Sequence, residues 1–127
     1  MNWLNWNWFL DVVKNKYVMF KGRASRKEFW TYILHYFILF IVASILDYIV
    51  GLIIQDTDTS IISGLLSLAL LLPTLAVTVR RLHDTGRSGW WLLIGLTGIG
   101  GILLLIWYVT DSQPSENKYG PNPKGIV

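Results

Sequence analysis

The feature that most constrains this chain is a set of three long apolar segments, residues 30–54, 61–79 and 90–109, which hold almost none of its charges. The hydrocarbon core of a bilayer is about 30 Å thick, and a helix rising about 1.5 Å per residue needs roughly 20 apolar residues to cross it. A spanning segment must also satisfy its own backbone groups there, which favours helices. We therefore predict an all-α integral membrane protein with three transmembrane helices.

The composition agrees with membrane placement, because 53% of the residues are hydrophobic, 15% are charged and the mean hydropathy is +0.45. Soluble domains carry about 25% charged residues. The segments outside the apolar runs are too short to bury a separate core, so we expect one membrane domain over residues 1–127. The chain has no cysteine, which excludes disulfides, thiolate metal ligands and cysteine nucleophiles.

Residues 1–21 carry an amphipathic pattern rich in tryptophan. Apolar side chains recur there at intervals of three and four residues, which places them on one face of a helix. They are Trp3, Trp6, Leu10, Val13 and Tyr17. A helix of this kind suits the headgroup boundary, so we predict an interfacial helix ahead of the first span. The alternative is that these side chains pack on the other helices.

The positive charges gather on one side of the predicted spans. Six lysines and arginines precede residue 30 and three lie in the loop 80–89, so nine of the eleven flank the same membrane face. Because positively charged flanks stay in the cytoplasm, we predict a cytoplasmic N-terminus. The link between the first two spans, which contains Asp56 and Asp58, and the irregular tail 110–127 are then expected outside.

The third apolar segment allows a second interpretation. Four glycines interrupt it and prompt a re-entrant segment that leaves on the side it entered. They are Gly95, Gly98, Gly100 and Gly101. A full crossing is preferred, because residues 90–109 contain no charged group and have the aromatic ends typical of a span. Those aromatic residues are Trp90, Trp91, Trp107 and Tyr108.

Local signals mark several helix boundaries. Gly22 can end the first helix, and Ser25 followed by Glu28 matches a capping box, so a new helix is expected to begin at Ser25. Pro73 lies inside the second span and is expected to bend it. Because proline has no N–H, the bend leaves backbone groups for Thr74 or a neighbouring helix to satisfy.

Two ionisable residues, His35 and Asp47, fall within the first span. A carboxylate at the bilayer centre costs about 2.5 to 3.5 kcal/mol on insertion scales, and such residues are functional candidates by default. Both residues lie toward the ends of the segment, within reach of water or headgroups. They are separated by roughly 120° around a helix, so they do not form a pair. A proton or ion site at Asp47 is one hypothesis, and an interfacial position is the other.

The densest polar cluster is the loop 80–91, together with the cations that precede residue 30. Guanidinium groups bind phosphate in bidentate fashion, and a helix N-terminus offers backbone N–H groups to anions. A lipid headgroup or another anion is therefore predicted to bind here. The candidate residues are Arg23, Arg26, Arg80, Arg81, His83, Asp84, Arg87 and Ser88.

The alternative for this cluster is topological anchoring. In that interpretation Asp84 pairs with Arg80 or Arg81, and Glu28 pairs with an arginine across the cytoplasmic face. The adjacent His83 and Asp84 suggest catalysis or metal binding only weakly, because no nucleophile with a defined partner and no further ligand set accompanies them. We therefore predict no catalytic residue, no metal site and no cofactor. Nucleic-acid binding is not expected, because the basic residues lie against the membrane.

Three blocks of the chain carry a family resemblance. They are residues 20–30 (FKGRASRKEFW), 80–91 (RRLHDTGRSGWW) and 117–123 (NKYGPNP). Together and in this order they resemble the bacterial inner-membrane family called domain of unknown function 805, which includes the YhaH-like proteins. The resemblance covers nearly the whole chain. It implies a small helical protein of the bacterial inner membrane, and it supplies no activity.

Three classes of function are compatible with these residues. The first is a non-enzymatic membrane protein that associates with the lipid bilayer, with a partner protein or with copies of itself, and the missing catalytic constellation favours it. The second is a subunit of an oligomeric transporter or channel for a small solute or ion, which would use Asp47. The third is a membrane enzyme that acts on lipid headgroups through His83, Asp84 and the arginines.

Overall fold

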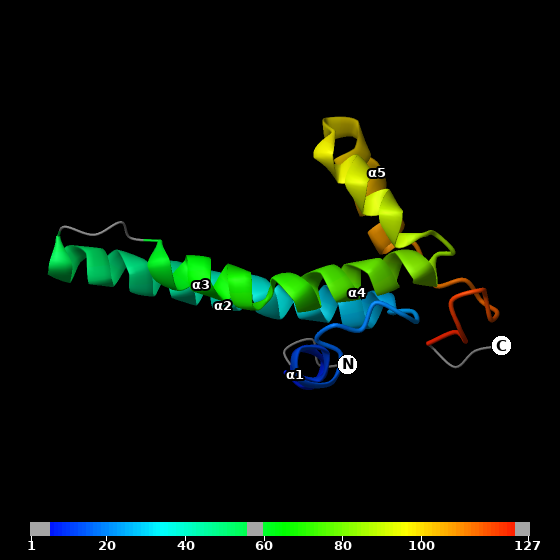
Figure 1. Cartoon of the computed structure of the whole chain (residues 1–127), viewed down its shortest axis with the longest axis horizontal. Coiled ribbons are helices and arrows are strands. Elements are labelled where there is room, and N and C mark those ends of the chain that lie inside the picture. Colours follow the sequence, from blue (N-terminus) through cyan, green and yellow to red (C-terminus); the bar gives the residue numbers. More distant parts are fainter. Residues whose placement is uncertain (1–5, 56–59, 124–127) are drawn as a thin grey trace.

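The longest helix, α2 (Arg26–Ile54), is the framework of the fold (Figure 1). The computed structural model describes residues 6–55 and 60–123. As the sequence predicts, α2 begins after Ser25, whose hydroxyl accepts a hydrogen bond from the backbone N–H of Glu28. With 29 residues, α2 is about 43 Å long, which exceeds the thickness of a hydrocarbon core.

Two shorter helices, α3 (Ile61–Ala69) and α4 (Leu71–Asp84), run back along α2 (Figure 1). Together they are long and apolar enough for a span, and they meet at a bend of 47°. The described residues therefore contain one helix fit to cross a membrane, or two such segments if α3 and α4 act as one. Trp3, Asp56 and Asp58, which the predicted topology also used, lie outside the described residues.

Pro73 explains the bend, and Tyr17 stabilises it. In a regular helix the N–H of residue 73 would bond to the carbonyl of Ala69, and proline has no such N–H. The Tyr17 hydroxyl donates to that carbonyl instead. The Tyr32 hydroxyl also lies 2.7 Å from Thr74 Oγ1 in the same turn. The predicted bend is confirmed, and the group that satisfies the freed carbonyl comes from the N-terminal region.

Helix α1 (Asn7–Asn15) lies across α2 and α4 and is seen nearly end-on in Figure 1. Its buried side chains are Phe9 and Val12, and Phe9 stacks on Tyr32 of α2 with ring centroids 5.2 Å apart. Trp6, which belongs to the predicted apolar face, is 39% exposed. The helix itself is confirmed, but its most buried side is centred on Phe9 and Val12, because these belong to the core cluster with residues of α2 and α4.

The third apolar segment folds back on itself instead of crossing as one helix. The 3-10 helix η1 (Gly89–Leu96) leads away from the end of α4, and α5 (Gly98–Val109) returns beside it (Figure 1). At the return, the carbonyl of Tyr108 accepts hydrogen bonds from Trp30 Nε1 at 3.0 Å and from Arg81 Nε at 3.1 Å. The predicted single crossing is therefore wrong, and the re-entrant alternative describes the path of this segment.

Thr97 and a glycine make the turn of this hairpin. The Thr97 hydroxyl accepts from the N–H of Gly100 at 3.0 Å, which caps α5, and donates to the carbonyl of Ile94 at 2.8 Å. A Cβ at Gly100 would lie 1.8 Å from that carbonyl oxygen, so a side chain does not fit there. The glycines that prompted the re-entrant alternative thus include the one that permits the turn, whereas the absence of charge is compatible with either path.

The C-terminal tail packs at the same end of the molecule as the residues before α2 (Figure 1). The backbone N–H of Gln113 donates to the carbonyl of Asp84 at 3.0 Å, and Asn117 Nδ2 donates to the carbonyl of His83 at 3.0 Å. Residues 110–123 therefore do not leave at the opposite end of the molecule as the predicted topology expected, and the side of the membrane on which they lie stays a prediction. The physical reason is that η1 and α5 bring the chain back to its starting point.

We expect Tyr17→Phe to lower the free energy of unfolding by about 0.5 to 1.5 kcal/mol, because it removes the hydrogen bond to the carbonyl that Pro73 leaves free at Ala69. In a Pro73→Ala background the alanine N–H satisfies that carbonyl, so Tyr17→Phe should cost much less. Denaturant unfolding of the parent, both single variants and the double variant in detergent micelles measures this coupling. Strictly additive effects would show that Tyr17 does not serve the carbonyl freed by proline.

Candidate functional site

Asp84, the last residue of α4, lies at the centre of a buried ion cluster. Its Oδ1 accepts from Nε of Arg23 at 2.9 Å, and its Oδ2 accepts from Nη1 of Arg81 at 2.6 Å. The hydroxyl of Ser112 also donates to Oδ2. The three charged side chains are at most 1% exposed. Buried charges persist only when they are paired and hydrogen-bonded, and here two guanidinium groups share one carboxylate.

The two arginines use further N–H groups on backbone carbonyls of the returning chain. Arg23 donates to the carbonyls of Gln113 at 2.7 Å and Ser115 at 2.9 Å. Arg81 donates to the carbonyl of Thr110. The cluster therefore joins three parts of the chain that are distant in sequence, namely the segment before α2, the end of α4 and the tail.

Glu28, in the first turn of α2, forms a second buried ion pair with Arg80 of α4. This pair and the pair of Asp84 with Arg81 are those that the anchoring alternative predicted, and both are confirmed. Arg80 Nε donates in addition to the carbonyl of Met19 at 3.0 Å. Four of the eight predicted anion-binding residues are thus buried and bonded within the protein. They are Arg23, Arg80, Arg81 and Asp84.

Lys16, just after α1, links the second pair to that helix. Its Nζ lies 3.5 Å from Glu28 Oε1 and 3.2 Å from Asp11 Oδ2. A hydrogen bond from the Asn15 side chain, together with the hydrogen bond and charge of Lys16, holds the pKa of Asp11 below its usual value despite an opposing effect of burial. Apolar packing and charge therefore both hold α1 at this end of the molecule.

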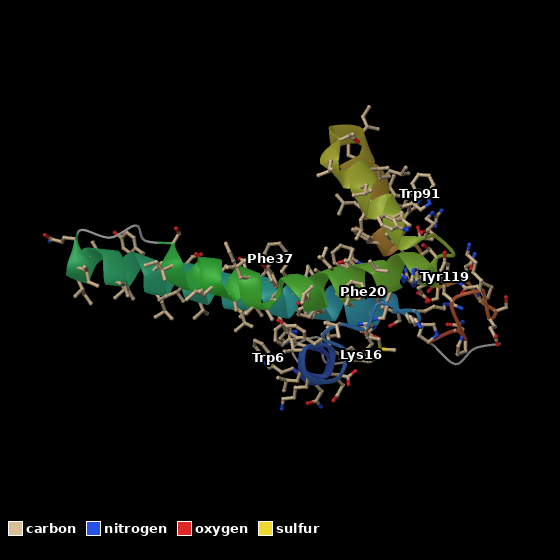
Figure 2. All side chains as sticks on the ribbon, in the orientation of Figure 1. Trp6, Lys16, Phe20, Phe37, Trp91 and Tyr119 are labelled. Carbon is tan, nitrogen blue, oxygen red and sulfur yellow. The ribbon has the colours of Figure 1, made fainter. Side chains whose placement is uncertain are left out.

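His83 and Asp84 are adjacent in sequence but contact different groups. His83 Nδ1 donates to the carbonyl of Gly22 at 3.0 Å, and its ring stacks on Tyr119 with centroids 3.9 Å apart. Figure 2 shows Tyr119 in the tail beside the end of α4. The carboxylate of Asp84 forms ion pairs with Arg23 and Arg81. The histidine therefore holds the tail in place, and the carboxylate neutralises buried cations.

A shallow pocket of about 340 Å³ opens beside His83. Its lining residues are Phe20, Val79, His83, Ser88, Gly89 and Trp90. Ser88 Oγ accepts the N–H of Trp90 at 3.3 Å and so caps η1. Gly89 is so close to Val79 that an added Cβ would lie 2.8 Å from that side chain. The pocket thus brings together two of the predicted residues, His83 and Ser88, within largely apolar walls.

The last two predicted residues lie nearer the surface. The exposed Arg26 has its guanidinium 3.5 Å from the carboxylate of Asp111. The guanidinium of Arg87 lies 4.3 Å from the ring centre of Trp107, and its Nη1 donates to the carbonyl of Thr85 at 3.2 Å. The structure therefore gathers the eight residues at one end of the molecule but divides them into a buried group and a peripheral group. Anion binding by any of them stays a prediction.

Asp47 has structural partners. Its carboxylate oxygens accept from the backbone N–H groups of Ile62 at 2.8 Å and Ser63 at 2.9 Å, in the first turn of α3. The first N–H groups of a helix have no partner within the helix, and a carboxylate there also suits the helix dipole. Asp47 of α2 therefore caps α3, and a proton or ion site at this residue stays a prediction.

His35 is fully buried, and its ring lies 4.2 Å from that of Trp6, which Figure 2 labels beside α1. Its Nδ1 donates to the carbonyl of Thr31 at 2.7 Å. Among the described residues, His35 Nε2, Thr31 Oγ1 and Arg80 Nη2 are buried without a hydrogen-bond partner. Trp6 therefore packs on α2, and the interfacial position of the N-terminal helix stays a prediction.

Sequence analysis missed the part that the returning chain plays in the site. Ser112 and the carbonyls of Thr110, Gln113 and Ser115 contribute acceptors or donors to the ion cluster. The only signal was the polar block 117–123, which includes the Tyr119 that stacks on His83. Within the described part of the chain, no group of three His, Cys, Asp or Glu side chains is placed to hold a metal ion.

The cationic end of the molecule, as we call the end that holds the eight predicted residues, is closed by the buried ion pairs. The helices define a small helical protein with at least one helix fit to cross a membrane. Residues 17–121 match the family described as Protein of unknown function (DUF805), and the chain belongs to that family. The inner membrane protein YhaH of Escherichia coli K12 is 40% identical over 119 residues, which cover 93% of this chain and 97% of that protein. The inner membrane protein YhaI of the same strain is 42% identical over 118 residues, or 92% and 95% of the two chains. No solved structure matches the chain.

We expect Asp84→Asn to lower the free energy of unfolding by about 3 to 5 kcal/mol, because it leaves two buried guanidinium groups without the carboxylate that neutralises them. Asp111→Asn is the matched control, because the exposed pair with Arg26 should contribute less than about 1 kcal/mol. Unfolding in detergent gives both values, and limited proteolysis should show release of the tail in the first variant only. Similar effects of the two substitutions would contradict a central role for Asp84.

Asp47→Ala should lower stability by about 0.5 to 2 kcal/mol, because helix caps contribute that much, and Asp47→Asn should retain part of the cap. Ser44→Ala, one turn earlier on the exposed side of α2, is the control and should change little. Thermal unfolding in detergent measures all three. Full stability of Asp47→Ala, combined with loss of an ion flux in vesicles, would favour an ion site over a cap.

Proposed function

We propose that this chain is a non-enzymatic component of the bacterial inner membrane that binds anionic lipid headgroups at its cationic end. The names of YhaH and YhaI support the location, and the excess of cations supports the cytoplasmic side for this end. In the topology that we propose, α2 and the pair of α3 and α4 cross the bilayer. The N-terminal region and the tail then both lie in the cytoplasm.

The observation that carries this proposal is the division of the cations into two sets. Arg23, Arg80 and Arg81 are buried and paired with carboxylates of the protein. A second set of cations, which we call the rim, is exposed or half-buried around them. The rim consists of Lys21, Arg26, Lys27, Arg87 and Lys118. Lipid phosphates can reach the rim without breaking the fold.

Two rim cations lie over tryptophan rings. Lys27 Nζ is 5.4 Å from the ring centre of Trp8, and the guanidinium of Arg87 is 4.3 Å from that of Trp107. Tryptophan is enriched at the boundary between membrane and water, and an anionic leaflet attracts each nearby cation by about 1 kcal/mol. The rim therefore combines the two features that place a surface at anionic headgroups.

The geometry gives less support to the other two classes of function. Asp47, the residue that an ion pathway would use, already binds two backbone N–H groups, and two spans per chain are too few to enclose a pathway. His83 and Asp84, the residues that an enzyme would use, are bonded to Gly22 and to two arginines. These bonds would have to break before either side chain met a substrate.

The thermal stability of the purified protein in nanodiscs of phosphatidylglycerol and of phosphatidylcholine tests the proposal. We expect a higher Tm in phosphatidylglycerol and a smaller difference in added salt. Arg26→Gln combined with Arg87→Gln should reduce that difference, because these arginines are two of the five rim cations. Arg26→Lys combined with Arg87→Lys keeps the charge but loses the planar guanidinium. This variant should therefore retain only the part of the Tm difference that depends on charge.

Glu116→Gln, in the exposed tail, is the control for this experiment and should leave the difference between the two lipids in place. A difference that is unchanged in the double glutamine variant would contradict headgroup binding by the rim.

A further inference from the structure

The hairpin of η1 and α5 is apolar on all its sides. Between Arg87 and Asp111 the chain has no charged side chain. The most exposed large apolar side chains of the described residues lie at its tip, with Leu96 at 88% and Ile99 at 85%. A helix that docks on protein from water usually keeps a polar face, whereas an all-round apolar surface is typical of an element in hydrocarbon. The surface of the hairpin therefore fits acyl chains.

Hydrogen bonds within the turn satisfy several backbone groups at the tip of the hairpin. The N–H of Thr97 donates to the carbonyl of Ile94 at 3.0 Å, and the N–H of Gly101 donates to the carbonyl of Thr97 at 3.1 Å. The Thr97 hydroxyl serves Gly100 and Ile94 in addition. Irregular backbone is tolerated at membrane depth only when its polar groups are satisfied. The bonds at Thr97 meet that condition for the groups that they join.

The hairpin is too short to cross a bilayer. The 12 residues of α5 rise about 18 Å, against a hydrocarbon core of about 30 Å. Both of its ends lie beside α4, because Gly89 packs on Val79 and the carbonyl of Tyr108 accepts from Arg81. Figure 1 shows the hairpin reaching sideways from the pair of α2 and α4. Only the leaflet around the cationic end is within its reach.

The base of the hairpin has the chemistry of a membrane boundary. Trp91 and Trp107 pack edge to face with centroids 5.5 Å apart, and Arg87 lies over Trp107. Trp91 is visible beside the base of the hairpin in Figure 2. Trp90 is 80% exposed at the same level. Tryptophan rings with a nearby arginine mark the headgroup level, with the apolar tip on one side and the charged tail on the other.

We propose that the hairpin of η1 and α5 inserts into the leaflet next to the rim, with its tip among the acyl chains and its base at the headgroups. The occupant of its surface is lipid, because the exposed residues surround the hairpin and the surface is continuous at its base with the helices fit to cross the membrane. The protein then occupies more area in this leaflet than in the other. The inference goes beyond the proposed function, because insertion depends on apolar contacts and headgroup binding depends on the rim cations.

Single cysteines introduced into this cysteine-free chain and labelled with a nitroxide test the proposal in vesicles. The labelled positions are all more than half exposed, so a label leaves the packing in place. They are Leu93, Leu96, Ile99, Ile102 and Val109. Labels at Ile41, near the middle of α2, and at the exposed Glu116 are the controls for membrane and water. Accessibility to oxygen and to a water-soluble nickel chelate gives the depth of each label.

We expect a symmetric depth profile. Val109 should lie shallow, Leu93 and Ile102 should lie at similar intermediate depths, and Leu96 and Ile99 should lie deepest without passing the bilayer centre. The profile should be the same in phosphatidylcholine and in phosphatidylglycerol, so that loss of headgroup binding does not alter it.

Three results would overturn the proposal. The first is a label depth that increases steadily from Leu93 to Val109 until it reaches the opposite leaflet, which means a full crossing. The second is access of the nickel chelate to the tip, which means that the hairpin lies in water. The third is exclusion of both reagents together with spin coupling between chains, which means that a second copy of the chain covers the hairpin.

Discussion

The pairing of one buried aspartate, Asp84, with two buried arginines holds the cationic end of this protein together. Guanidinium groups at this depth need an acceptor for most of their N–H groups, and carbonyls of the tail supply several of them. The chain must therefore come back to the end of α4 after its third apolar segment. That requirement connects the start of α2, the hairpin and the tail through a single cluster.

Features that depend on nearby residues could be predicted from the sequence. The start of α2 follows from the cap at Ser25, and the bend follows from the N–H that Pro73 lacks. The pairing of Glu28 with an arginine also followed from opposite charges expected at the same membrane face. In each case the physical cause acts over one or two helical turns, or depends on charge alone.

Features that depend on distant contacts could not be predicted in the same way. An uncharged segment of about 20 residues suits a crossing and a hairpin equally, and the choice here depends on bonds such as that from Arg23 to Ser115. Asp47 is another example, because its role as a cap depends on where α3 begins beside it. The predicted anion-binding residues lie together at one end of the molecule, but burial separates them into a structural cluster and a group nearer the surface.

The side of the membrane on which the C-terminus lies tests this arrangement most directly. Green fluorescent protein and alkaline phosphatase, each fused to Val127 in bacterial cells, report the two sides, because the first fluoresces in the cytoplasm and the second is active only outside it. The returning chain predicts a fluorescent fusion and an inactive phosphatase, on the same side as matched fusions to the N-terminus. An active phosphatase and a dark fluorescent fusion would contradict the return of the chain to Asp84.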